Sequence, residues 1–229
     1  MSIFDGIPFF SGLDAKRIEK YGRQCQRKRF VEHELVVDFE DLSKDVYFIV
    51  AGDVRVLNRT ASGKEVILGD FGAGNFFGEM AAIDDAHRSA NVTALTNAEV
   101  LIVPPTIFRE IIYSEPKICE RLMRLFTERV RLLNARLFER SVLDLRHRLY
   151  AELLRMSIKR KGVKDQMIIS PPPFQHDLAA RIGCRREQVS RELTAMIEDG
   201  LLEKIRGGLV LPRPALLKKR IQDAMNETE

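Results

Sequence analysis

Residues 76–90 read FFGEMAAIDDAHRSA, which places a glycine, an acid and an arginine–serine pair within one short stretch. Gly78 has no Cβ, so the backbone there can approach a phosphate closely. Arg88 offers a planar, two-pronged contact to an anion, and Ser89 adds a hydroxyl donor. Glu79 would repel a phosphate, so we assign it to a donor such as a ribose hydroxyl. The stretch therefore predicts a site for an anionic ligand with hydroxyls; the alternative is a surface turn with an ordinary Glu–Arg pair.

Short runs rich in β-branched and aromatic residues flank this stretch on both sides. They lie at residues 34–37, 46–50, 54–57, 65–68, 91–95 and 98–103, and glycine-containing turns at 51–53, 61–64 and 72–75 separate them. Strands at this spacing indicate an antiparallel sandwich or barrel. The stretch 76–90 is then an insertion between the fourth and fifth strands, where a binding loop is expected.

A long helix is predicted from Lys117 to about Ser141, because this segment has neither glycine nor proline. Two apolar stripes run along it at helical spacing, one made of Ile118, Leu122, Leu125 and Leu132, the other of Phe126, Val130, Leu133 and Leu137. A helix with two apolar faces needs two partners. One face can pack on the β-rich part and the other on the same helix of a second chain; the alternative buries both stripes within one subunit.

The C-terminal part begins after a break at residues 141–144, with Asp144 as the N-cap of a helix predicted to reach about Lys159. Two short helices follow, at 175–182 and 186–199, joined by a turn at Gly183-Cys184. Next come two short strands around Arg206-Gly207-Gly208. This order is typical of a winged helix-turn-helix; the alternative is an ordinary helical hairpin with a polar surface.

The second of these helices presents side chains that can read base edges, with arginine for guanine and glutamate for cytosine. They are Arg185, Arg186, Glu187, Gln188, Ser190 and Arg191. Residues 141–229 hold 17 Lys and Arg against 12 Asp and Glu, whereas residues 1–140 hold 20 against 21. The whole basic surplus lies in the C-terminal part, which favours a polyanionic partner there.

The composition limits the classes that remain. With 45% apolar and 31% charged residues over 229 positions, the chain is typical of one or two globular domains. Its three cysteines and four histidines are scattered, which predicts neither disulfides nor a metal site. We see no secretion signal and no apolar run of membrane-spanning length, and therefore expect a cytoplasmic protein.

Nearly the full length of the chain resembles the cyclic AMP receptor protein group of bacterial regulators, the CRP/FNR family. Gly78-Glu79 followed by Arg88-Ser89-Ala90 resembles that family's phosphate-binding cassette, and residues 63–68 resemble the strands before it. Residues 142–145 resemble its hinge, and residues 182–191 resemble its recognition element. The resemblance implies an α+β fold, with a jelly-roll-like, cyclic-nucleotide-binding β-roll at 1–113. It further implies a dimerisation helix at 114–141 and a winged helix-turn-helix DNA-binding domain at 142–229.

By the same resemblance, Glu79 would bind the ribose hydroxyl, and Arg88 and Ser89, with the Gly78 backbone, the cyclic phosphate. The other implied contacts come from Leu68, Phe71, Met80, Ala81, Leu133 and Asn134. The implied partners are cyclic AMP, a second copy of the chain, RNA polymerase, and double-stranded DNA with TGTGA-like half-sites read by Arg186, Glu187 and Arg191.

One departure concerns the base of the nucleotide. Family members that hold adenine place hydroxyl-bearing residues on the long helix, where this chain has Leu133-Asn134. Leu133 cannot hydrogen-bond to the adenine amino group, so cyclic GMP, another effector or none are alternatives. The absence of an N-terminal cysteine cluster argues against an iron–sulfur centre, and no axial haem ligand stands out. An enzyme acting on nucleotides is disfavoured because no nucleophile–base pair, metal-ligand set or Walker-type loop is present.

Overall fold

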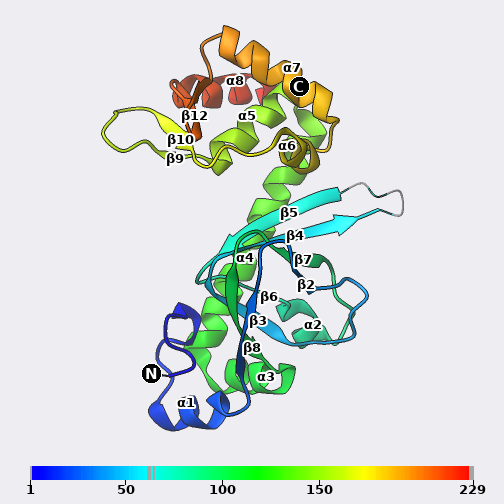
Figure 1. The fold of residues 1–229 in the computed structure, drawn as a ribbon, viewed down its shortest axis with the longest axis vertical. Coiled ribbons are helices and arrows are strands. Elements are labelled where there is room, and N and C mark those ends of the chain that lie inside the picture. The colour runs from blue at the N-terminus through cyan, green and yellow to red at the C-terminus, as the bar shows by residue number, and fades with distance from the viewer. Residues whose placement is uncertain (1, 61–62, 64, 227–229) are drawn as a thin grey trace. The chain divides into compact units, whose positions relative to one another are not determined.

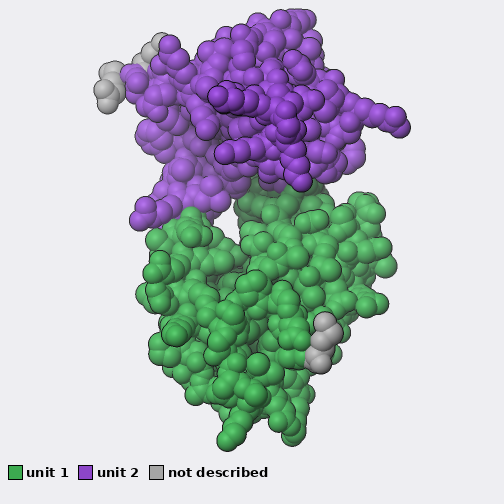
Figure 2. Space-filling view, turned by 90° about the vertical axis from the view of Figure 1, so that its left-hand side faces the viewer, with its two compact units in different colours: residues 1–129 green, residues 130–229 purple. Residues whose placement is uncertain are grey.

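The computed structural model describes residues 2–60, 63 and 65–226 and consists of two compact units, residues 1–129 and 130–229 (Figures 1 and 2). The long helix α4 (Pro116–Val142) belongs to both, because the division falls within it. The turn predicted at 61–64 lies mostly outside the described residues. The boundaries at 113/114 and 141/142 stay a prediction, and each unit is described by itself.

The first unit contains two four-stranded antiparallel sheets. One has the order β1 (Gln26–Phe30), β8 (Ala98–Val103), β3 (Val46–Ala51), β6 (Phe76–Phe77). The other has the order β2 (Leu35–Val37), β7 (Asn91–Ala94), β4 (Asp53–Arg59), β5 (Glu65–Gly72). Side chains from both sheets share one apolar core that includes Phe30, Val37, Ile49, Val54, Phe77, Val92 and Val100. This arrangement confirms the predicted antiparallel β-roll.

A second core in the first unit is rich in aromatic residues and joins helices to one sheet. Its helices are η1 (Pro8–Phe10), α1 (Ala15–Gly22), α2 (Glu79–Asp84), α3 (Pro105–Ser114) and the first half of α4. Phe9, Phe48 and Phe76 have ring centroids 4.8–5.2 Å apart, a favourable distance for tilted aromatic pairs. Because Phe76 belongs to this core, the strand β6 that leads into the 78–90 segment is firmly anchored.

The helix α4 buries the N-terminal part of its apolar surface and exposes most of the rest, including Leu132 of the first stripe, which is 42% exposed. Ile118 and Leu122 are buried in the aromatic core, and Leu125 packs against it. On the other stripe, the exposed fractions of Leu133 and Leu137 are 60% and 66%. The predicted alternative, burial of both stripes within one subunit, is therefore wrong.

The second unit is a helical bundle with a small antiparallel sheet, in the order β11 (Glu203–Ile205), β12 (Gly208–Leu211), β10 (Met167–Ile169), β9 (Ile158–Lys159). Its helices are α5 (Leu145–Met156), α6 (Gln175–Ile182), α7 (Arg186–Glu198) and α8 (Pro214–Asn226), together with the end of α4. The predicted extension of α5 to Lys159 is wrong. The chain leaves the helix at Ser157, and Ile158 pairs with Ile168 because an extended partner strand is available there.

A buried charge cluster joins three helices of this unit. Glu152 of α5 is only 3% exposed, and it accepts hydrogen bonds from Arg155 and from Arg181 of α6. Arg155 also donates to both carboxylate oxygens of Glu139 of α4, at 2.7 and 2.8 Å. The end of α4 is therefore held to α5 across the break at Leu143-Asp144, where the Asp144 side chain accepts a hydrogen bond from the His147 N–H as predicted.

Candidate functional site

Gly78 forms the turn between β6 and α2 with a left-handed conformation, φ +85°. A Cβ at this position would lie 2.7 Å from Arg88 Nη1 and 2.7 Å from the Asp45 carbonyl oxygen. Both the conformation and the contacts exclude larger residues. Gly78 thus lies close to the chain's own Arg88 and to the Asp45 backbone, and the predicted approach of a phosphate to Gly78 stays a prediction.

Glu79, the first residue of α2, is buried with 3% of its surface exposed. Its carboxylate accepts a hydrogen bond from Arg129 Nη1 at 2.5 Å, and Arg129 Nη2 also donates to the Phe76 carbonyl at 3.0 Å. Burial raises the pKa of the Glu79 carboxyl, and the Arg129 guanidinium opposes that shift. Glu79 is thus a buried acid supported by a cation from α4.

Sequence reasoning missed Arg129. Its guanidinium carbon lies 5.2 Å from the ring centroid of Phe71 and 5.6 Å from that of Phe76. One feature of the sequence could have identified Arg129: it is a cation that lies between the two apolar stripes of α4. A charged residue there needs a buried partner, and Glu79 provides it.

Arg88 is also buried, with 3% of its surface exposed, and its two terminal nitrogens donate to the protein. Nη1 donates to the Gly78 carbonyl at 3.1 Å, and Nη2 donates to Ser43 Oγ and the Asp45 carbonyl, both at 3.0 Å. Its Nε is buried and has no hydrogen-bond partner among the described residues. Burial lowers the pKa of Arg88 from its ordinary value, and nearby Tyr47 and Asp41 oppose that shift. The site therefore contains a buried cation whose Nε has no hydrogen-bond partner among the described residues.

The remaining predicted ligand residues differ in how accessible they are. Ser89 is exposed, and its hydroxyl lies 3.8 Å from Met80 Sδ. Leu68 and Met80 are exposed and Phe71 is half-buried, whereas the methyl group of Ala81 is buried, so only its backbone can meet a ligand. Leu133 and Asn134 are exposed on α4, four and five residues beyond Arg129.

The predicted DNA-reading side chains surround the start of α7. Gly183, with φ +75°, ends α6 and turns the chain, and a Cβ there would meet the Arg140 guanidinium. Val189, Leu193 and Met196 bury one face of α7. Arg185, Arg186, Glu187 and Arg191 are exposed, whereas Gln188 and Ser190 are half-buried. The side-chain oxygen of Gln188 accepts from the Arg185 N–H at 3.1 Å, so Gln188 caps the helix.

The predicted wing follows α7 as the antiparallel pair β11–β12, whose turn contains Arg206 and Gly207. The two helices, the left-handed turn between them and this hairpin together form a winged helix-turn-helix. The ordinary helical hairpin is therefore excluded.

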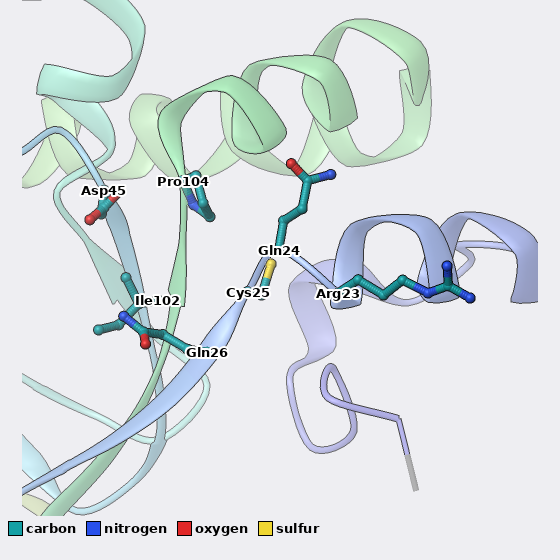
Figure 3. A pocket seen from close by; sticks show the side chains of 7 residues that line it. All are labelled: Arg23, Gln24, Cys25, Gln26, Asp45, Ile102 and Pro104. Atoms are coloured by element: carbon teal, nitrogen blue, oxygen red, sulfur yellow. The ribbon is translucent and has the colours of Figure 1, made fainter.

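A hollow of about 370 Å³ lies elsewhere on the first unit, between β1, α1 and the start of α3 (Figure 3). Cys25, Asp45 and Ile102 contribute to its lining, and Arg23 extends away from Asp45 (Figure 3). Burial raises the pKa of the Cys25 thiol to about 12, so it is no nucleophile at neutral pH. Gln24, Gln26 and Pro104 complete its lining.

Neither a metal centre nor a membrane-spanning helix is found among the described residues. Within them, no group of three or more His, Cys, Asp or Glu side chains is arranged to hold a metal ion. Across the same part of the chain, every helix is too short or too polar to span a bilayer.

Comparison with known families assigns both units. The family model for the cyclic nucleotide-binding domain matches residues 27–115, and the model for the Crp-like helix-turn-helix domain matches residues 117–220. The cyclic AMP receptor protein of Thermus thermophilus is 30% identical over 217 residues, which cover 93% of this chain and 96% of that protein. The cAMP-activated global transcriptional regulator Vfr of Pseudomonas aeruginosa is 26% identical over 191 residues, 82% of this chain and 89% of that protein.

Solved structures agree on the fold. The c-di-GMP responsive global regulator CLP of Xanthomonas campestris superposes with a TM-score of 0.72 at 22% identity, over 86% of this chain and 99% of that one. A CooA mutant from Carboxydothermus hydrogenoformans gives 0.75 at 20% identity, over 87% of this chain and 88% of that one.

Proposed function

The chain belongs to the CRP/FNR family of DNA-binding transcription regulators, and from this premise we propose that it is a homodimer that binds a cyclic nucleotide and then a palindromic DNA site. The observation that carries the effector proposal is Arg88. A buried guanidinium N–H without an acceptor is costly, and an anionic oxygen completes it with a charge-assisted hydrogen bond. A cyclic phosphate supplies such an oxygen with a single negative charge.

In the proposed complex, Arg88 Nε and the Ser89 hydroxyl donate to the cyclic phosphate, next to the Gly78 backbone. Glu79 accepts from the ribose 2′-hydroxyl while it keeps its bond to Arg129. Leu68, Phe71, Met80 and the backbone of Ala81 line the site, and Leu133 and Asn134 meet the base. We propose cyclic AMP as the effector, because the Thermus thermophilus and Pseudomonas aeruginosa relatives carry it in their names, with cyclic GMP as the alternative.

The proposal is tested by calorimetric titration with cyclic AMP and cyclic GMP, followed by operator titration with and without the nucleotide. Arg88→Ala is expected to weaken nucleotide binding roughly 10- to 150-fold, because a charged donor contributes about 1.5–3 kcal/mol per hydrogen bond. Nonspecific DNA binding should be unchanged. Arg23→Ala, which removes an exposed arginine of the same unit, serves as the control. A nucleotide titration that Arg88→Ala leaves unaltered would remove the 76–90 segment from the proposal.

DNA recognition in this proposal uses two α7 helices, one from each subunit. They enter successive major grooves about 34 Å apart, which explains a palindromic site with TGTGA-like half-sites. The ligand changes how the two α4 helices pair, and the break at residues 143–144 passes that change to the DNA-binding units. The ligand achieves this only through its different affinities for the two arrangements. RNA polymerase is the expected further partner. Because the proposed target is chromosomal DNA, we expect the protein in the cytoplasm.

Arg186→Ala is expected to cost about 1–3 kcal/mol of operator affinity and to relax selectivity at one base pair. Arg186 is exposed at the first position of α7, where a guanidinium can contact a guanine bidentately. Fluorescence anisotropy on the operator and on single-base variants measures both effects. Lys219→Ala removes the same charge from the exposed face of α8 and should change neither the affinity nor the base preference. If Arg186→Ala kept the full selectivity among the single-base variants of the operator, another side chain would have to contact that base.

A second candidate keeps the DNA-binding function and replaces the nucleotide with another effector or none. Leu133 favours it, because an apolar side chain there offers no hydrogen bond to a purine amino group. Absence of heat with both cyclic nucleotides, combined with unchanged operator affinity, would select this candidate. An enzymatic role receives no support from the relatives, which are regulators.

A further inference from the structure

The loop between β2 and β3 holds Arg88, although it lies outside the 76–90 segment. Arg88 Nη2 donates to Ser43 Oγ and to the Asp45 carbonyl, each at 3.0 Å. On the other side, Nη1 donates to the Gly78 carbonyl at 3.1 Å. Two segments that are more than thirty residues apart in the sequence therefore accept hydrogen bonds from the two terminal nitrogens of one guanidinium.

The direction of the Ser43 hydroxyl follows from the chemistry of its two partners. Ser43 Oγ lies 3.0 Å from Asp41 Oδ2 and 3.0 Å from Arg88 Nη2. A guanidinium only donates and an ionised carboxylate only accepts, so Ser43 must donate to Asp41 and accept from Arg88. The Ser43 N–H also donates to Asp41 Oδ1 at 2.9 Å, and these bonds lower the pKa of Asp41 and keep it ionised.

The guanidinium is planar, so fixing both terminal nitrogens also fixes the direction of Nε. Arg88 Nε is the nitrogen that stays buried without a partner among the described residues. The contacts of Ser43, Asp45 and Gly78 therefore engage both terminal nitrogens and leave Nε as the nitrogen without a partner, oriented for a ligand.

We propose that Ser43, oriented by Asp41, is a positioning residue of the nucleotide site that sets the direction of Arg88 Nε toward the phosphate. This inference rests on the proposed cyclic-nucleotide function. It adds the β2–β3 loop to a site otherwise built from β5, the 76–90 segment and α4.

Three variants test it by calorimetry with cyclic AMP and cyclic GMP. Ser43→Ala removes the acceptor and should weaken binding about tenfold, the loss expected for one charge-assisted hydrogen bond. Ser43→Thr keeps the hydroxyl and should restore binding to within about threefold of the parent. Ser114→Ala removes an exposed serine of α3 in the same unit and should have no effect. Equal affinities for Ser43→Ala and Ser114→Ala would overturn the proposal.

A second measurement separates this inference from the proposed function. In protein labelled on arginine, restricted rotation about the Arg88 Cζ–Nη bonds gives distinct Nη signals, which Arg88→Lys identifies by their loss. Ser43→Ala should merge these signals, whereas Ser43→Thr and Ser114→Ala should keep them separate. If the parent protein binds neither nucleotide and Ser43→Ala still merges the Nη signals, Ser43 remains the positioning residue of Arg88 and the proposed effector is refuted. Signals that stay separate in Ser43→Ala would refute the role of Ser43 whatever the ligand.

Discussion

Glu152→Ala is expected to lower the free energy of unfolding of the C-terminal unit by about 3–5 kcal/mol, the cost of removing one partner from a buried ion cluster. Glu152 is 3% exposed and accepts hydrogen bonds from Arg155 and Arg181. Arg136 Nη2 lies 4.0 Å from the same carboxylate. Without Glu152, Arg155 and Arg181 lose a buried acceptor, and Arg136 loses the neighbouring negative charge.

Hydrogen exchange followed by mass spectrometry measures this effect, because it reports on the 145–182 peptides separately from the β-roll. Glu203→Ala removes an exposed acid of β11 in the same unit and should change the stability by less than about 0.5 kcal/mol. If the two variants exchanged equally fast, the buried cluster would carry no net stability. Faster exchange confined to α4 through α6 would assign the cluster to the junction between α4 and the rest of the DNA-binding unit.

The strands that could be predicted from the sequence are those that are themselves rich in β-branched and aromatic residues. Val46–Ala51 and Ala98–Val103 are dense in β-branched residues because both lie in the middle of a sheet. The strand β1, with the sequence QRKRF, was missed because four of its five residues are exposed. It is a strand because β8 supplies a partner edge, and ion pairs of Arg27 and Arg29 with Glu99 cover its outer face. Pairing of this kind depends on the tertiary structure, so the local sequence of β1 does not predict it.

The candidate site divides in the same way. Gly78, Glu79 and Arg88 lie within eleven positions of one another, so a sequence motif could identify them together. Arg129 and Ser43 are about fifty and forty-five residues from their partners. Each is an ordinary polar residue in its own segment, and only the fold shows that it completes the environment of a buried charge. Hydrogen-bond partners of buried groups are therefore the part of the site that needed the structure.

An apolar stripe that is mostly exposed runs along α4, and of its residues Phe126 packs partly against the core of the first unit. Met123, Phe126, Val130, Leu133 and Leu137 are spaced by three, four, three and four residues. This is the a and d spacing of a coiled-coil seam, and along it Leu137 is 66% exposed in the single chain. A stripe of this length in water is costly, and pairing with the same stripe of a second copy buries it.

Leu137→Asp is expected to convert the proposed dimer into a monomer at micromolar concentration. It places two like charges against each other at one position of a C2 seam, and each must lose its water. A cost of at least about 4 kcal/mol per dimer corresponds to a roughly thousandfold weaker association. A monomer reads only one half-site, so operator affinity should fall toward the nonspecific level.

Sedimentation equilibrium and operator binding measure the two consequences on the same sample. Ala135→Asp introduces the same charge on α4 two positions away, outside the seam, where the side chain is exposed. It should remain dimeric and bind its operator like the parent, because its carboxylate stays in water. A dimer that survives Leu137→Asp would show that the exposed stripe is not the surface through which two copies pair. A dimer lost in both variants would instead indicate a general sensitivity of α4 to added negative charge. If two copies pair along this stripe, Leu137→Asp alone should lose the dimer, and its operator affinity should fall.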